Sequence, residues 1–200
     1  LDGSSVSITD GAVDDADVIA TVDLNGKNTV GSDDTINVTL NSADDDGTSS
    51  TPATFEVDDL QVDGYENVKI ESTGEANADN KIDTFTANSV ETVTISGDRD
   101  LDIDDTVDAT KIDASTFTAA LTVTLADEDQ AVTGGKGDDT FVIAPANLDK
   151  DDTIDGGDGE DTIAVNADFD ISGGTTDLNN VSNIEQIGLG DNNVDVTVDD

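Results

Sequence analysis

The chain has 200 residues, with 48 Asp and Glu against 7 Lys and Arg, which gives a formal net charge of −41 at pH 7. Such an acidic surface repels phosphate and anionic headgroups, so we expect neither nucleic acid nor a membrane surface as a partner. Cysteine, methionine, histidine and tryptophan are absent, which excludes disulfides, Cys/His metal sites and catalysis by a thiol or an imidazole. Cations held by oxygen ligands are the expected partners.

The apolar content is only just sufficient for a folded core. Leu, Ile, Val and Phe together make up 49 residues, slightly above the level below which a highly charged chain is usually disordered. We therefore expect folding to require something that removes negative charge. No apolar run approaches the roughly 20 residues of a spanning helix, so direct membrane insertion is not expected. The first residue is Leu1 rather than Met, which suggests a piece excised from a longer chain.

Composition favours β-structure. Aspartate outnumbers glutamate 40 to 8, and Val, Ile and Thr together number 60. Aspartate favours turns because it bonds to nearby backbone amides, whereas branched side chains fit a pleated surface. We predict an all-β fold of short strands joined by Asp/Gly turns. In chain order, the predicted strands cover residues 35–40, 68–70, 93–95, 121–125, 141–143 and 162–165.

A repeated pattern indicates how these strands are arranged. An apolar residue, Glu and a polar residue precede a strand at 65–70, 90–95 and 184–189, and a degenerate copy occupies 120–125. Each copy contains one strand, and the copies at 65–70, 90–95 and 120–125 begin 25 and 30 residues apart. This spacing predicts the irregular coils of a right-handed parallel β-roll or β-solenoid, in which each coil covers the apolar residues of the next. The alternative is an antiparallel β-sandwich, with a calcium-binding segment, whose strands happen to begin alike.

A second pattern, Asp-Thr followed by an apolar residue, occurs at Asp34, Asp83, Asp105, Asp139, Asp152 and Asp161. At two of these positions it lies inside a complete G-G-x-G-x-D-x-U-x motif, over residues 134–142 and 156–164. Glycines allow positive φ and close backbone approach, so carbonyl oxygens can converge in such turns. Asp139 and Asp161 would each add a carboxylate, which gives the oxygen-rich environment that Ca²⁺ accepts. Phe141 and Ile163 are then predicted to point into the core.

This spacing resembles the calcium-binding nonapeptide repeats of the RTX (repeats in toxin) family, whose members wind a parallel β-roll with Ca²⁺ between stacked turns. The resemblance implies that Asp139 and Asp161 are ligands. It also implies ligation by the backbone carbonyls of Gly134, Lys136, Gly137, Gly156, Asp158 and Gly159.

The two motifs depart from the family pattern in their spacing. In the family, two nonapeptides make one coil, so a motif that begins at Gly134 would be followed one coil later by a motif that begins at position 152. Here the second motif begins at Gly156. We therefore expect an enlarged opposite edge, where residues 144–154 replace the intervening repeat. Asp149, Asp151 and Asp152 in this segment are candidates for a calcium site of another geometry.

The wider pattern is similar to RTX-bearing bacterial surface-layer proteins and large secreted adhesins. The motifs GGxGxDTF and DGGxGxDTI, with the segment 178–189 behind them, carry this likeness. It implies type I secretion, folding outside the cell in calcium, and self-association into a lattice or binding to cell-surface glycans. We expect solenoid-like repeats over 1–128 and an RTX-like roll with terminal strands over 129–200, or one continuous elongated domain.

The functional hypothesis is therefore a noncatalytic, extracellular, calcium-binding structural module of a bacterial cell surface. The alternatives are a repeat module of a secreted adhesin and a calcium-binding roll attached to a secreted hydrolase. Catalysis by a carboxylate pair on glycosides is disfavoured, because five Phe, one Tyr and no Trp provide few aromatic platforms for sugars. Acidity as adaptation to high salt would explain the charge but not the glycine spacing.

Asp98, Asp100, Asp102 and Asp104 alternate with other residues, as in a cation ladder or a solvated strand face.

Overall fold

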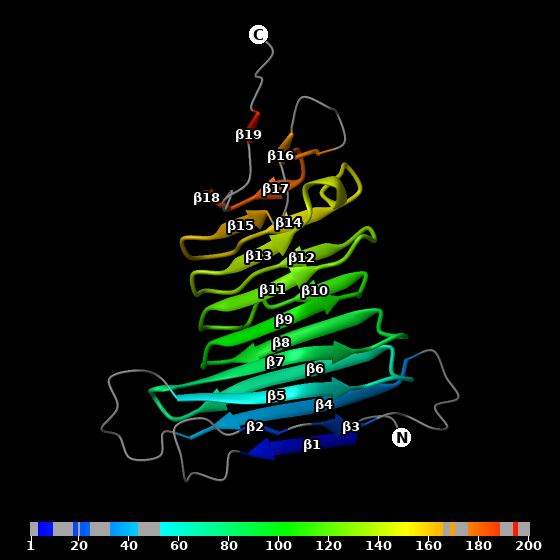
Figure 1. Cartoon of the computed structure of the whole chain (residues 1–200), viewed down its shortest axis with the longest axis vertical. Coiled ribbons are helices and arrows are strands. Elements are labelled where there is room, and N and C mark those ends of the chain that lie inside the picture. Colours follow the sequence, from blue (N-terminus) through cyan, green and yellow to red (C-terminus); the bar gives the residue numbers. More distant parts are fainter. Residues whose placement is uncertain are drawn as a thin grey trace.

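The chain forms a parallel β-solenoid in which strands alternate between two sheets (Figure 1). This computed structural model describes residues 4–9, 18–19, 21–24, 33–43, 53–165, 169–170, 176–188 and 194–195. Every strand pairing among these residues is parallel. The all-β prediction is confirmed, and the antiparallel sandwich is wrong.

Two long sheets make up the solenoid. In spatial order, sheet A contains β1 (Ser4–Thr9), β4 (Thr35–Ser42), β6 (Asn67–Gly74), β8 (Thr92–Gly97), β10 (Lys111–Asp113), β12 (Ala131–Thr133), β14 (Thr153–Asp155) and β17 (Val181–Ser182). Sheet B contains β18 (Gln186–Gly188), β15 (Thr162–Val165), β13 (Thr140–Ile143), β11 (Leu121–Leu125), β9 (Leu101–Val107), β7 (Ala78–Thr86), β5 (Ala53–Gln61) and β2 (Val18–Ile19). In addition, β3 (Val22–Asp23) pairs with β5, and β16 (Phe169–Asp170) pairs with β19 (Val194–Asp195).

The coils differ in length along the chain, and the longest lie at its N-terminal end. On sheet A, Val6 pairs with Val38 and Val68 pairs with Val93, so the interval between partners falls. It is shorter still where Val93 pairs with Ile112. Strand length falls from 8 residues in β4 to 3 residues in β10. The solenoid therefore tapers, and its N-terminal coils are the widest (Figure 1).

The core lies between the two sheets and is built from alternate residues of each strand. β4, for example, buries every second side chain, as expected for a strand with one face on a core. Phe141 and Ile163 are fully buried, which confirms their predicted orientation. The largest fully buried side chains are Phe55, Phe117, Phe141, Ile36, Leu40, Leu60, Ile70, Ile82, Ile95, Leu101, Ile103 and Ile112.

The sequence repeats correspond to coils only in part. The segments 65–70 and 90–95 lie one coil apart on sheet A, with Val68 paired to Val93. The copies at 120–125 and 184–188 instead lead into strands of sheet B, β11 and β18. All the copies therefore have the sequence of a turn that leads into a strand, but they do not occupy equivalent positions in the coil. Leu189 lies outside the described residues.

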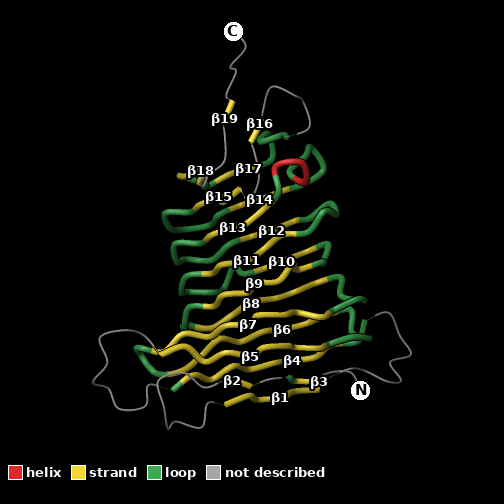
Figure 2. The backbone as a smooth tube through the Cα atoms, viewed as in Figure 1, coloured by secondary structure: helices red, strands yellow, loops and turns green. Residues whose placement is uncertain are grey.

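Both sheets continue past position 128, where a change of repeat type was expected. β10 pairs with β12 in sheet A, and β11 pairs with β13 in sheet B. One 3₁₀ turn, Pro145–Asn147, lies in the loop between β13 and β14, and the other loops between β5 and β15 stack along the two edges of the solenoid (Figure 2). Over the described ranges, no helix has the length and apolarity needed to cross a membrane.

Candidate metal sites

The two glycine-rich motifs form stacked turns at one edge of the solenoid. We call this the A-to-B edge, because each turn here leads from a sheet A strand to the next sheet B strand. The first turn, 134–139, joins β12 to β13, and the second, 156–161, joins β14 to β15. The amide of Gly134 donates to the carbonyl of Asp155 (2.8 Å), and the amide of Asp158 donates to that of Gly135 (3.0 Å). The turns therefore lie directly on one another despite their wide spacing in the sequence.

The stacking is so close that only glycine fits at the first position of each turn. A Cβ on Gly134 would lie 2.0 Å from the carbonyl oxygen of Gly156 and 2.6 Å from Asp139 Oδ2. A Cβ on Gly156 would lie 1.9 Å from the carbonyl oxygen of Asn183 and 2.5 Å from Asp161 Oδ2. In each turn, a carbonyl oxygen of the next coil and a carboxylate oxygen of the same turn thus both lie close to the glycine Cα, where a larger residue would carry its Cβ.

This geometry brings some of the predicted ligands together and leaves others at the surface. The Gly156 carbonyl and the Asp139 carboxylate converge as described, and Gly137 lies under Gly159, whose Cβ would be 2.3 Å from the Gly137 carbonyl oxygen. The remaining predicted residues Lys136 and Asp158 are exposed. With Gly134 they line a surface cavity of about 300 Å³.

Buried carboxylates form a column behind these turns. Asp139 is 1% exposed, and its two oxygens accept the amides of Leu121 (2.9 Å) and Gly135 (2.6 Å). Asp161 is fully buried, and its Oδ1 accepts the amide of Asp139 (2.8 Å). Glu185 continues the column, because its Oε2 accepts the amide of Asp161 (2.8 Å). Each acid therefore satisfies a backbone amide of the coil before it, as a side chain does when it caps a helix.

The column concentrates negative charge in a buried region. Burial raises the pKa of Asp139 to about 6, although its hydrogen bonds from Gly135 and Leu121 oppose the shift. Burial also raises the pKa of Asp161, and the charges of Glu185, Asp138 and Asp155 add to the rise. Asp161 Oδ2 is buried and has no hydrogen-bond donor among the described residues. A buried carboxylate oxygen without a donor is costly unless a cation or a proton compensates it.

These shifts predict how the metal-free protein responds to pH. Between the ordinary pKa of 3.8 and about 6, the folded chain keeps a proton on Asp139 that the unfolded chain releases. The stability contributed by this proton is complete below the ordinary pKa and is lost as the pH rises through the folded-state pKa. At about 1.4 kcal/mol per pKa unit, the loss is up to about 3 kcal/mol. Because the metal-free chain is expected to be largely disordered at neutral pH, circular dichroism in EDTA follows this loss: the β-rich signal should weaken as the pH rises from mildly acidic to neutral.

Two variants distinguish the effect of Asp139 on the pH dependence of stability from the effect of general charge repulsion. Asp139→Asn cannot titrate and is expected to show a shallower fall of stability with pH. Asp138→Asn removes a neighbouring carboxylate that lies nearer the surface and is expected to keep the slope of the parent. Equal slopes in all three proteins would show that the buried carboxylate does not control the pH dependence.

The opposite, B-to-A edge is enlarged after β13, as the wide spacing of the two motifs predicts, and it gathers a second set of acids. Oxygens of Asp129, Asp149 and Asp151 lie within 4.8 Å of one another. Asp152 does not join them. It is buried and accepts the amides of Gln130 (2.9 Å) and Asp149 (2.8 Å), so it closes the turn. Two of the three predicted candidates are thus brought together, and Asp129, from the previous coil, completes the cluster.

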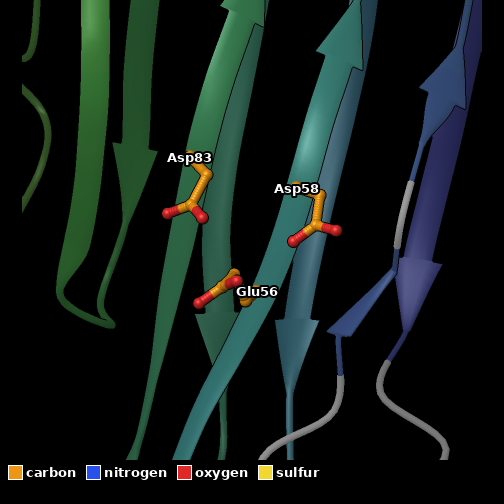
Figure 3. Close-up of side chains that lie close together, drawn as sticks. All are labelled: Glu56, Asp58 and Asp83. Carbon is orange, nitrogen blue, oxygen red and sulfur yellow. The ribbon is translucent and has the colours of Figure 1, made fainter.

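A third group of acids lies on the face of sheet B away from the core and was not predicted. Glu56 and Asp58 of β5 and Asp83 of β7 place carboxylate oxygens within 4.8 Å of one another (Figure 3). Asp58 lies two residues after Glu56, with buried Val57 between them, and so shares this face of the strand. Burial and the charge of Asp83 raise the pKa of Glu56. Like the cluster at the B-to-A edge, this arrangement could hold a metal ion.

A lysine already supplies positive charge to this third group. Lys81 Nζ lies 2.6 Å from Asp83 Oδ1, 3.0 Å from Asp104 Oδ2 and 4.0 Å from Glu56 Oε2. The hydrogen bonds to Asp83 and Asp104 raise the pKa of Lys81 far above its ordinary value. Lys81 is therefore charged at all physiological pH values and acts as the internal counterion of the acids around it.

The alternating aspartates at 98–104 do not form a four-carboxylate row. β9 begins at Leu101, so only Asp102 and Asp104 lie on the strand. Asp98 pairs with Arg99 (3.3 Å), and Asp100 Oδ1 accepts the amide of Ala120 (2.9 Å) at the A-to-B edge. The cation-ladder interpretation is therefore wrong for the first two residues.

Replacing Lys81 with methionine is expected to lower the free energy of unfolding by about 1–2 kcal/mol at the lowest calcium concentration that folds the parent, because three carboxylates lose a charged partner. A higher calcium concentration should recover part of this loss. Lys111→Met is the matched control, since Lys111 pairs with Asp113 at 2.8 Å and its side chain is 51% exposed. An exposed pair of this kind contributes about 0.5 kcal/mol. Equal losses in the two variants would contradict the role of Lys81.

Comparison with protein-family models, with curated proteins and with solved structures gives no match for this chain. The family resemblance therefore stays a prediction.

Proposed function

We propose that the chain is a noncatalytic, calcium-binding structural module that folds and assembles when Ca²⁺ binds. The observation that carries this proposal is the stack of two glycine turns at the A-to-B edge. There, each turn holds a buried carboxylate, Asp139 in the first and Asp161 in the second, close to a carbonyl oxygen of the next coil, and no basic side chain among the described residues pairs with either. Hard oxygens in a flexible arrangement suit Ca²⁺ better than Mg²⁺, which demands a near-ideal octahedron.

The ligand set for this site follows the stacked turns. Asp139 and Asp161 supply carboxylates, and the carbonyls of the turns supply neutral oxygens. Calcium would supply the positive charge that the buried carboxylates lack, and binding to the folded chain alone would stabilise it. The net charge of −41 makes this contribution large, because each bound ion cancels two of the charges that repel one another.

The shape of the molecule suits a structural role. A solenoid is a one-dimensional stack of coils with long, regular outer faces, and carboxylates on these faces remain available for calcium bridges to another copy. We place such a module outside the cell, at a bacterial surface reached by type I secretion, where free calcium is abundant. The proposed partners are calcium and further copies of the chain in a surface layer.

Imaging of the purified protein with and without calcium tests the proposal. Ordered sheets that form in CaCl₂ and disperse in EDTA are the expected result. Dispersed particles that are retained on cell-surface glycans would favour an adhesin instead. Hydrolysis of a polysaccharide panel, abolished by replacing a carboxylate pair, would contradict the noncatalytic assignment.

A further inference from the structure

The outer face of sheet A carries almost no net charge. Its side chains are the residues of each strand that alternate with the buried ones and point away from the core. Three of them are acidic, Glu71, Asp113 and Asp155, and two are basic, Lys69 and Lys111. The other outward side chains of these strands are serine, threonine and asparagine, with one alanine. The formal charge of the face is therefore −1, in a chain whose net charge is −41.

Sheet B presents the opposite kind of face. On β7 and β9, the exposed and part-exposed side chains include five acids, Asp79, Asp83, Asp102, Asp104 and Asp105, and one base, Lys81. Two strands of sheet B thus carry more acids than the outer face of the whole of sheet A. Copies of so acidic a chain repel one another, and the repulsion is weakest where a face has the least net charge. Of the two broad faces, sheet A is the one that a second copy can approach.

The face also has the chemistry and the size for contact with a copy of itself. Serine, threonine and asparagine side chains both donate and accept hydrogen bonds, so such a face is complementary to itself. Its strands range from 2 residues in β17 to 8 residues in β4. With about 3.3 Å per residue and about 4.8 Å between strands, the face covers roughly 600 Å². Two copies would bury about 1,200 Å² in total, which is at the lower end of specific protein interfaces.

The register of the strands indicates how two copies would align. Lys69 of β6 pairs with Thr94 of β8, which pairs with Asp113 of β10, so the three side chains form one row across the face. Lys69 is exposed and has no ion pair among the described residues, whereas Lys111 already pairs with Asp113 (2.8 Å). A two-fold axis that lies in the interface along β8 reverses the order of the coils. Lys69 of each copy then lies opposite Asp113 of the other, and the two copies of Thr94 meet at the axis.

We infer that sheet A is the contact face between two copies of the chain, which pack face to face about a two-fold axis along β8. Such an interface uses the same residues of both copies. The inference deepens the proposed function, because it names the surface through which copies associate and rests on calcium to fold them. The acidic face of sheet B stays on the outside of the pair, available for calcium bridges to further copies.

Sedimentation equilibrium tests the interface, at a calcium concentration that folds the chain but forms no sheets, in about 0.15 M NaCl to screen the net charge. The parent is expected to be a dimer that dissociates on dilution. Thr94→Asp brings two carboxylates together at the axis and should raise the dimer Kd about tenfold or more, because like charges that meet in an interface repel strongly. Thr122→Asp is the matched control, since Thr122 is also a part-exposed threonine within a strand, but on sheet B. Its Kd should equal that of the parent, and circular dichroism in calcium confirms that both variants fold.

Charge reversal tests the alignment. Lys69→Glu should weaken the dimer, because the new carboxylate faces Asp113 of the second copy. Adding Asp113→Lys to Lys69→Glu should restore most of the lost affinity, and a Kd that this second change leaves where it was would contradict the axis at β8. A dimer that is weakened by Thr122→Asp and not by Thr94→Asp would place the contact on sheet B and overturn the inference.

The behaviour of the parent separates this inference from the proposed function. A parent that gains β-structure in calcium but stays monomeric at every concentration overturns the sheet A interface and leaves calcium-coupled folding in place. A parent that folds and forms the sheet A dimer equally well in EDTA overturns the proposed role of calcium and leaves the interface in place.

Discussion

Replacing Gly134 with alanine is expected to destabilise the folded protein by more than about 4 kcal/mol, a loss that few single substitutions cause. The added Cβ would lie 2.0 Å from the Gly156 carbonyl oxygen and 2.6 Å from Asp139 Oδ2. Neither atom is the end of a flexible side chain that can move aside, because Asp139 is held by two backbone amides. The coils would have to separate, which would move the Gly156 carbonyl oxygen away from the Asp139 carboxylate.

Gly188→Ala is the matched control for this prediction. The nearest atom to a Cβ there is Thr162 Cγ2 at 3.6 Å, an ordinary contact, so the change should be within about 0.5 kcal/mol. Urea unfolding in calcium measures both variants. Similar midpoints for Gly134→Ala and Gly188→Ala would mean that the turns are not stacked as closely as described.

Calcium removal is expected to have the largest effect of all. A domain of this kind is stabilised by only about 5–15 kcal/mol, and the metal-free chain must hold buried Asp139 and Asp161 together against a net charge of −41. We expect a far-ultraviolet circular dichroism spectrum that is largely disordered in EDTA and β-rich in millimolar CaCl₂. Magnesium at the same concentration should restore much less β-structure.

Sodium chloride at matched ionic strength is the control for screening. Salt at about 0.1 M screens exposed charges beyond about 10 Å but acts weakly on buried ones. It should therefore leave most of the disordered signal in place. Full recovery of the β spectrum in NaCl alone would favour adaptation to high salt over specific calcium sites.

The features that could be predicted from sequence are those that one segment of chain carries by itself. Alternation of apolar residues predicts the strands, and the motif around Asp139 predicts both a tight turn and an inward Phe141. The wide spacing of the two motifs predicts the enlarged loop that contains the 3₁₀ turn Pro145–Asn147. Each of these depends on local backbone preferences or on the alternation of side chains along a strand.

The features that were missed depend on which residues lie one coil apart. Coil length varies along sheet A, as the different intervals within the pairs Val6–Val38 and Val93–Ile112 show. No fixed offset therefore connects an acid such as Asp58 to its neighbour on the next coil.

Glu185 was missed as the third acid of the column because the turn 183–185, which joins β17 to β18, lacks the glycine motif. The acids behind the turns nevertheless recur at similar intervals, since Asp139 and Asp161 are 22 positions apart and Asp161 and Glu185 are 24 apart. A search for acids that recur at intervals close to one coil would have found these three residues as one series.

The most direct test of the account is a crystal structure of the protein grown in calcium, with anomalous scattering data that locate the metal. We predict anomalous peaks between the stacked turns 134–139 and 156–161, with oxygen ligands at about 2.3–2.6 Å. Well-ordered turns without a peak, in a protein whose melting temperature is the same in calcium and in chelator, would contradict it.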